Sequence, residues 1–412
     1  MTYQARRPGR LALWLLVVAF VAGHDLPALA QEWTVNANLR TGFSYTDNLA
    51  LSDDDDSDDG PSLFSSTGLG LNARYQTDES NISVSTGFTA RAKIIGDDGD
   101  DFRTATPSLN ASAAFSLGRV SSNSSLNFRL DNVAFTEFSD TGALNSDGIF
   151  VDGSALRLDL SVGQSFGYAL TQRNSVSVST GASITRFSDS DEELEDSTSF
   201  FGSVGFSRAV SDRLSLNFSL SASRFTSDDE EQTRGTSFGA SFGFSRRLLL
   251  DARIGGNLGV RVTNVTEDIL FEPFGTDSET NIGFVGGFNF SYDLGRTRLG
   301  ASIGQSISPN EDGDITESTR FGLSASRSIA PRQSVGLSLG VNRRTSITDV
   351  VGAPSESDQD LFGQISTSYR YQITENWRAN LSYSFRVRND SNETEFSNGV
   401  FLGFSRPFNL VN

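Results

Sequence analysis

The segment WRANLSYSFRVR, residues 377–388, decides the fold because apolar and polar residues alternate along its whole length. Trp377, Leu381 and Phe385 fall on one side of such a segment, while its arginines, asparagine and serines fall on the other. A period of two residues is typical of a β-strand with one apolar face and one solvated face. The segment therefore predicts a strand that separates an apolar environment from water.

The same alternation recurs along the chain after residue 31. Residues 33–45, 82–94 and 214–222 each place apolar side chains on one face and Ser, Asn, Thr, Gly or Arg on the other. No segment of this part shows a convincing helical period of 3.6 residues. We therefore predict that everything beyond the first 30 residues is β-structure.

Short and long connections alternate between the predicted strands, and both kinds are rich in turn-forming residues. The short turns centre on Asp78-Glu79, Ser121-Ser122, Thr171-Gln172, Ser211-Asp212, Leu250-Asp251, Gly295-Arg296, Pro331-Arg332 and Glu375-Asn376. The longer, acidic loops lie near Asp53–Gly60, Asp97–Asp101, Asp140–Gly148, Asp189–Asp196, Asp228–Glu231, Glu267–Asp277, Asn310–Asp314, Asp349–Ser357 and Asn389–Glu393. Eight turns and nine loops join 18 strands, which form a repeating array of hairpins.

The first 30 residues are typical of a signal peptide. Arg6, Arg7 and Arg10 precede an apolar run at residues 11–22, and Pro27–Ala30 supplies a small-residue cleavage site before Gln31. The run is too short for a spanning helix, which needs about 20 apolar residues. We expect residues 1–30 to be cleaved after export.

A closed barrel in a membrane explains the alternation better than a soluble sandwich. A meander of 18 strands would leave long open edges, and closure removes them. The polar faces cannot form a packed core, but they can line a water-filled lumen while the apolar faces contact lipid. Residues 31–412 are therefore predicted to be a single transmembrane antiparallel up-and-down β-barrel of about 18 strands. Its short turns would be periplasmic and its longer acidic loops extracellular, in the outer membrane of a Gram-negative bacterium.

Two segments resemble known outer-membrane barrels. The last strand, Val400–Phe408, resembles their C-terminal assembly signal in its alternating apolar residues and late phenylalanine, which implies that the barrel assembly machinery is a partner. The first strand and loop, GFSYTDNLALSD at residues 42–53, resemble uncharacterised barrels associated with exopolysaccharide and PEP-CTERM systems. This second resemblance implies a role beside polysaccharide secretion, with secreted polysaccharide as a partner.

Composition argues against an enzyme and against nucleic-acid binding. The formal net charge of −18 disfavours a polyanionic partner, and there is no cysteine for a disulfide or a thiolate metal site. The single histidine, His24, lies in the predicted signal peptide. The single lysine, Lys93, lies in an alternating strand without a nucleophile motif beside it. We expect no catalytic residue and no cofactor.

The acidic loops offer weak candidates for a metal site at Asp53, Asp54, Asp55 and Asp56. Several carboxylates can bind Ca²⁺ or Mg²⁺, but the spacing does not match an EF-hand loop. Solvated, mutually repelling loops are the favoured interpretation. Loose bridging of divalent cations to lipopolysaccharide is the alternative.

Basic residues recur on the polar face of several strands, toward the loop end. They would form a pore-lining basic ring, and its members are Arg40, Arg91, Lys93, Arg129, Arg261, Arg344, Arg386 and Arg388. One interpretation is a selectivity role, and the other is that these residues neutralise the acidic loops. By strict alternation Arg186 and Arg224 would face lipid, which would require a bulge or contact with lipid phosphates.

The predicted function is passive passage of polar solutes through a porin-like or polysaccharide-export-associated pore. This prediction rests on the number of strands, because barrels of 16–18 strands leave an aqueous channel. The main alternative is a structural or surface-interaction barrel whose lumen is sealed by loops. A secreted β-solenoid adhesin is a third possibility, and it would be soluble without detergent.

Overall fold

The structure of the chain is a computed structural model. The structure describes residues 32–48, 61–95, 103–132, 156–188, 196–227, 233–248, 251–268, 276–309, 315–346, 359–389 and 394–411. The predicted signal peptide, residues 1–30, lies outside these ranges. Among the described residues, no helix is long and apolar enough to cross a membrane.

The described residues form 18 β-strands. They are β1 (Glu32–Thr46), β2 (Ser62–Gln76), β3 (Ser80–Ile95), β4 (Arg103–Leu117), β5 (Val120–Asn132), β6 (Leu156–Ala169), β7 (Asn174–Ser188), β8 (Ser197–Ser211), β9 (Leu214–Ser227), β10 (Arg234–Arg247), β11 (Ala252–Asp268), β12 (Thr276–Asp293), β13 (Thr297–Pro309), β14 (Ile315–Ala330), β15 (Gln333–Ser346), β16 (Gln359–Gln372), β17 (Arg378–Asn389) and β18 (Thr394–Val411).

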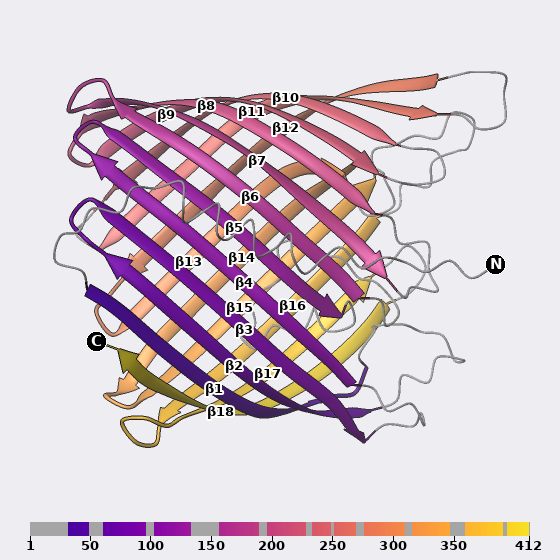
Figure 1. Cartoon of the computed structure of the whole chain (residues 1–412). Helices are drawn as coiled ribbons and strands as arrows, with labels where there is room; N and C mark the ends of the chain where they lie inside the picture. The colour runs from indigo at the N-terminus through magenta and orange to yellow at the C-terminus, as the bar shows by residue number, and fades with distance from the viewer. Residues whose placement is uncertain are drawn as a thin grey trace, which may run out of the picture.

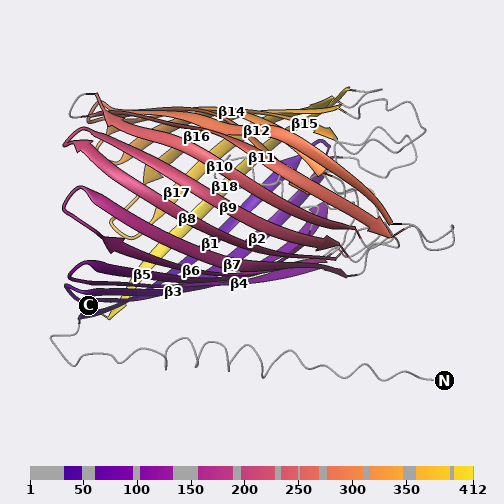
Figure 2. The same cartoon turned by 90° about the horizontal axis from the view of Figure 1, so that it is seen from above.

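The strands form one closed sheet, as Figures 1 and 2 show. Each strand pairs antiparallel with its neighbours in sequence, and β1 pairs with β18 to close the ring. The short turns gather at one end of the barrel together with the C-terminus (Figure 1). We call this the turn end and the opposite one the loop end. The prediction of an 18-stranded antiparallel up-and-down barrel is confirmed.

Alternation determines which side chains face outward. In β9 the side chains of Phe218 and Leu220 are exposed on the outside, and the adjacent Ser219 and Ser221 face the lumen. Because the exposed apolar side chains recur around the ring, the outer surface is a lipid-facing band and not a packing surface for a soluble core. The protein is therefore an outer-membrane barrel.

Six of the eight predicted turns are correct, and a seventh, Leu250-Asp251, lies partly outside the described residues. The prediction at Ser121-Ser122 is wrong, because β5 already begins at Val120 and both serines pair with β4. The chain turns three residues earlier, at Gly118, whose φ of 59° lies in the left-handed region that glycine tolerates without strain. Gly295, with φ of 72°, makes the equivalent turn between β12 and β13, as predicted.

The long connections lie largely outside the described residues. Where the structure does reach the predicted loop Glu267–Asp277, it corrects the boundaries: β11 continues through Asp268 and β12 begins at Thr276. The β11–β12 hairpin is therefore longer than predicted, and Figure 1 shows it extending past neighbouring strands at the loop end.

The barrel closes through side chains as well as through the β1–β18 ladder. Asp47 accepts hydrogen bonds from the backbone N and the side-chain Nδ2 of Asn398, at 2.6 and 2.7 Å. Farther toward the turn end, the ring of Phe401 covers the paired glycines Gly42 and Gly403, where any Cβ would meet ring carbons within 2.8 Å. Both contacts hold the last strand against the first.

Candidate functional site

The lumen is the candidate functional site, because it is the polar surface that the ring of strands encloses. Directly paired residues of an antiparallel ladder lie on the same face, so the registers assign each side chain to the lumen or to lipid. The registers place all eight members of the basic ring on the lumen face. These residues are Arg40, Arg91, Lys93, Arg129, Arg261, Arg344, Arg386 and Arg388.

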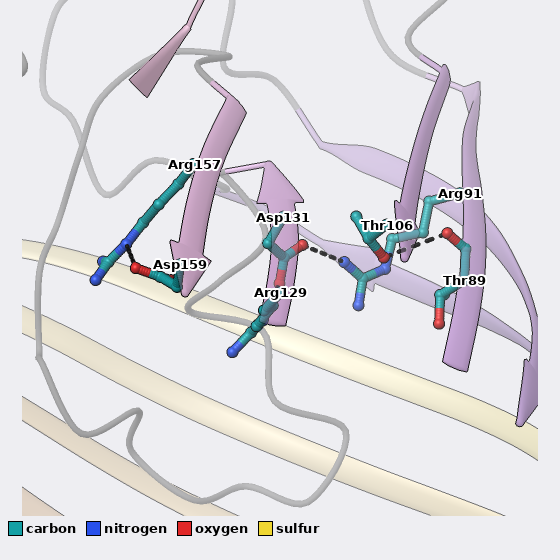
Figure 3. A network of polar contacts seen from close by, with 7 residues as sticks. All are labelled: Thr89, Arg91, Thr106, Arg129, Asp131, Arg157 and Asp159. Carbon is teal, nitrogen blue, oxygen red and sulfur yellow. Dashed lines mark hydrogen bonds and ion pairs between the residues drawn. The ribbon is translucent and has the colours of Figure 1, made fainter. Parts of the chain in front are cut away.

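Two of these arginines share one carboxylate, which Figure 3 shows between them. Arg129 of β5 donates from Nε and Nη2 to Oδ2 of Asp131, and Arg91 of β3 lies 3.8 Å from the other oxygen of that carboxylate. The side chain of Asp131 is 7% exposed. A carboxylate between two guanidinium groups fixes both of them against the lumen wall.

A second ion pair lies beside the first, on β6. Arg157 donates from Nε to Oδ1 of Asp159 at 3.0 Å, and the same oxygen accepts from the hydroxyl of Thr185 on β7. The guanidinium of Arg157 also lies 5.9 Å from the ring centre of Phe187. Asp131, Arg157 and Asp159 are not among the predicted site residues, although the alternation that identified Arg129 places them on the lumen face as well.

Arg386 differs from the other members of the basic ring because it is only 1% exposed. Its Nη2 donates to Oγ of Ser397 at 2.9 Å and to the carbonyl oxygen of Asn48 at 3.4 Å. Thr46 completes the group through its hydroxyl, which lies 3.2 Å from that of Ser397. Arg386 therefore joins β17, β18 and the end of β1, and it presents little charge to solution.

Arg261 of β11 also binds a backbone carbonyl. Its Nη1 donates to the carbonyl oxygen of Ile307 on β13, two strands away. The basic ring is thus heterogeneous: Arg91 and Arg129 form ion pairs, while Arg261 binds a backbone carbonyl of β13 and Arg386 binds one just beyond the end of β1. A selectivity role for the ring stays a prediction.

The lumen faces of β7, β8 and β9 form a different surface, which we call the serine wall. Within these three fully described strands no charged residue faces the lumen. Serine hydroxyls pair across the strands, with Ser179 and Ser203 2.6 Å apart and Ser183 and Ser199 also 2.6 Å apart. Because β8 and β17 are nine strands apart in a ring of 18, the serine wall lies opposite Arg386 and Arg388.

Arg186 and Arg224 face outward without a β-bulge in their strands. The ladders run through Arg186 and Arg224 without a register shift, so both side chains face outward. Arg186 forms an ion pair with Asp196 at 2.8 Å, and the other oxygen of that carboxylate accepts from the backbone N of Phe187. The bulge prediction is therefore wrong, since a neighbouring carboxylate at the loop end satisfies Arg186.

The weak metal candidates Asp53, Asp54, Asp55 and Asp56 lie outside the described residues. Within the part of the chain that the structure describes, no three His, Cys, Asp or Glu side chains come together in a group that could hold a metal ion.

An outer apolar band around a polar lumen of 18 antiparallel strands defines a large outer-membrane β-barrel of the porin type. The chain is similar to the outer-membrane channel DcaP of Acinetobacter baumannii, at 13% identity and a TM-score of 0.43 over 93% of this chain and 99% of that one. It is also similar to OccK1 (OpdK) of Pseudomonas aeruginosa, at 12% identity and a TM-score of 0.47 over 92% of this chain and 99% of that one. No family model and no curated protein matches the sequence.

Proposed function

We propose that the protein is a passive channel for small polar solutes. The observation that carries the proposal is the composition of the lumen face, which consists mainly of serine, threonine, asparagine, glycine and arginine over the 18 described strands. Such a face is stable only when it is hydrated, and a ring of this size leaves room for water at its centre.

The distribution of charge supports a preference for anions. The basic ring lies on β1, β3, β5, β11, β15 and β17, and its carboxylates lie on β5 and β6, while the serine wall carries no charge. A solute that crosses the lumen would meet fixed guanidinium groups on one side and neutral hydroxyl groups on the other. Anionic groups would be drawn to the first wall, and neutral polar groups would hydrogen-bond to the second.

Conductance of single molecules in planar lipid bilayers tests this proposal. We expect a stable open current of nanosiemens scale and a reversal potential that favours anions in a salt gradient. A reconstituted barrel that carries no current would contradict the channel proposal and support the loop-sealed structural barrel instead. Solubility without detergent would support the adhesin alternative.

The proposed partners are membrane lipid, lipopolysaccharide and the barrel assembly machinery. Divalent cations and secreted polysaccharide stay predictions from the acidic loops and from residues 42–53. A link to polysaccharide secretion would be tested by deletion of the gene, with loss of surface polysaccharide as the expected result.

A further inference from the structure

The junction between β12 and β13 differs from every other junction in the ring. These strands pair only from Gly286 with Gln305 to Asp293 with Arg298, which is the shortest ladder of the barrel. Both strands continue toward the loop end, where β12 pairs with β11 as far as Thr276 and β13 pairs with β14 as far as Pro309. We call the unpaired stretch, residues 276–285 of β12 and 306–309 of β13, the seam.

The two strands overlap at the seam. Alternation places Ile307 on the outer face of β13, yet Ile307 is only 2% exposed and packs against Val265 of β11 and Val285 of β12, which face the lumen. A Cβ on Gly283 would lie 2.0 Å from Cδ1 of Ile307. The end of β13 therefore lies on the lumen side of the β11–β12 hairpin, with Ile307 against the glycine.

Side-chain contacts take the place of a backbone ladder where the two strands overlap. The carbonyl oxygen of Ile307 accepts from Arg261, and the apolar contact involves Val265, Val285 and Ile307. The ladders that join β12 to β11 and β13 to β14 do not depend on pairing between β12 and β13. The seam can therefore open while the β11–β12 and β13–β14 ladders stay intact.

The seam begins at the outer edge of the lipid-facing band. Beside it, Ile282 and Phe284 of β12 point outward and are 69% and 66% exposed. Toward the loop end the outward side chains become polar, as Asn264 donates to the hydroxyl of Thr280. An opening here would connect the lumen with the boundary between hydrocarbon and head groups.

We propose that the seam is a lateral passage for single-tailed anionic amphiphiles between the lumen and the lipid layer. Separation of Ile307 from Val265 and Val285 exposes apolar side chains to an aliphatic tail. The same movement frees the guanidinium of Arg261 from the carbonyl of Ile307, so that it can bind an anionic head group. This lateral route is additional to the axial channel proposed above.

A disulfide across the seam tests the passage. Because the chain has no native cysteine, only the introduced pair can form a disulfide within it. The double variant Val265→Cys with Ile307→Cys would be oxidised in intact cells, and uptake of a fluorescent dodecanoate would be compared before and after reduction. The control is Ser338→Cys with Ser366→Cys, whose hydroxyls lie 2.6 Å apart in the regular β15–β16 ladder.

We expect oxidation of the seam pair to lower protein-dependent uptake at least tenfold, and reduction to restore it, with no change in the control pair. Equal uptake through the oxidised and reduced seam would overturn the proposal, and so would failure of this pair to crosslink while the control does. If the reduced double variant is not assembled, Gly283→Cys with Ile307→Cys replaces it. Single-channel conductance of both oxidised variants reports on the axial pore separately, so the two proposals can fail independently.

Discussion

At the scale of single residues, Asp131 determines how much positive charge the basic ring presents. It accepts from Arg129 and lies within ion-pair distance of Arg91, so one carboxylate offsets part of the charge of two guanidinium groups. This carboxylate is nearly buried, and water screens its interactions less than it would those of an exposed pair.

We expect Asp131→Asn to increase the preference of the channel for anions, because one negative charge leaves the lumen while both arginines stay. The reversal potential in a salt gradient measures the change. The matched control is Asp196→Asn, which removes the same charge from the ion pair with the outward-facing Arg186. An equal shift in both variants would mean that net charge, and not the lumen position, sets the preference.

The contact between Phe201 and Gly181 is a second feature at the scale of residues. It faces the lumen from β8 and lies over its ladder partner Gly181 on β7, where an added Cβ would be 2.4 Å from the ring and 2.6 Å from the carbonyl oxygen of Val162. The ring covers backbone that glycine leaves open, as Phe401 does at the barrel closure.

Gly181→Val should therefore displace the ring of Phe201 toward the centre of the lumen and strain the β6–β7 ladder. We expect a smaller conductance and a loss of stability of about 1–3 kcal/mol, as for other overpacked sites. Gly70→Val on β2 is the control, since the nearest atoms to a Cβ there are 3.9 Å away. Similar effects of both substitutions would contradict the explanation by contact with Phe201.

At the scale of elements, the last strand is held to the first by charged and neutral contacts near the loop end. Removal of the carboxylate in Asp47→Ala deletes two hydrogen bonds to Asn398. Hydrogen bonds to charged groups contribute about 1.5–3 kcal/mol. We expect a total loss of about 1–3 kcal/mol in urea unfolding from lipid vesicles, because Asp47 is partly exposed. Asp212→Ala, in the exposed turn between β8 and β9, should change stability by less than about 0.5 kcal/mol.

Strand number, strand faces and most turns could be predicted because a period of two residues is a local property of the sequence. The segment at residues 377–388 needed no knowledge of its neighbours to be recognised as a strand with lumen-facing arginines. The turn at Gly118 was misplaced because several polar residues follow it, and the hydroxyl-rich Ser121-Ser122 pair is equally compatible with a turn.

The roles of the lumen residues and the seam could not be predicted in the same way. Alternation places Arg386 in the lumen, but its burial depends on Ser397 and Asn48, which are distant in sequence. Alternation also places Ile307 against lipid, whereas the overlap of β13 with the β11–β12 hairpin buries it. Such contacts depend on how strands meet in space, which a single-strand pattern does not contain.

At the scale of the whole molecule, outward arginines mark both edges of the lipid-facing band. Arg224 lies on the outside near the loop end and Arg208 near the turn end, and between them the outward residues of β9 include Phe218 and Leu220. Arginine at such edges can reach lipid phosphates, while at the centre of the bilayer it is costly.

We expect Leu220→Arg to destabilise the barrel by about 2–4 kcal/mol in urea unfolding from lipid vesicles, as charged residues do at the midplane. Ser221→Arg, at the next position but facing the lumen, should be tolerated with less than about 1 kcal/mol of change. A larger loss of stability in Ser221→Arg than in Leu220→Arg would mean that Ser221 faces lipid and Leu220 faces the lumen.

The distribution of charge between lumen and outer surface gives the last prediction. Arg91→Ser with Lys93→Ser removes two positive charges from the lumen face of β3, and Arg208→Ser with Arg246→Ser removes two from the outer surface near the turn end. Only the first pair lies along the path of a permeating ion, while the second is directed toward lipid. Under the channel proposal the lumen variant should shift the reversal potential toward cations, and the outer variant should leave it nearly unchanged.

High salt should reduce the difference between the two variants, because the Debye length falls from about 10 Å at 0.1 M to about 3 Å at 1 M ionic strength. Arg386→Ser with Arg388→Ser is a poorer test of selectivity, since Arg386 also joins three strands and its loss should lower stability first. If the lumen and outer variants shift the reversal potential equally, the arginines act through the total charge of the molecule. The basic ring would then have no selective role, and the serine wall would be left as the surface that contacts the solute.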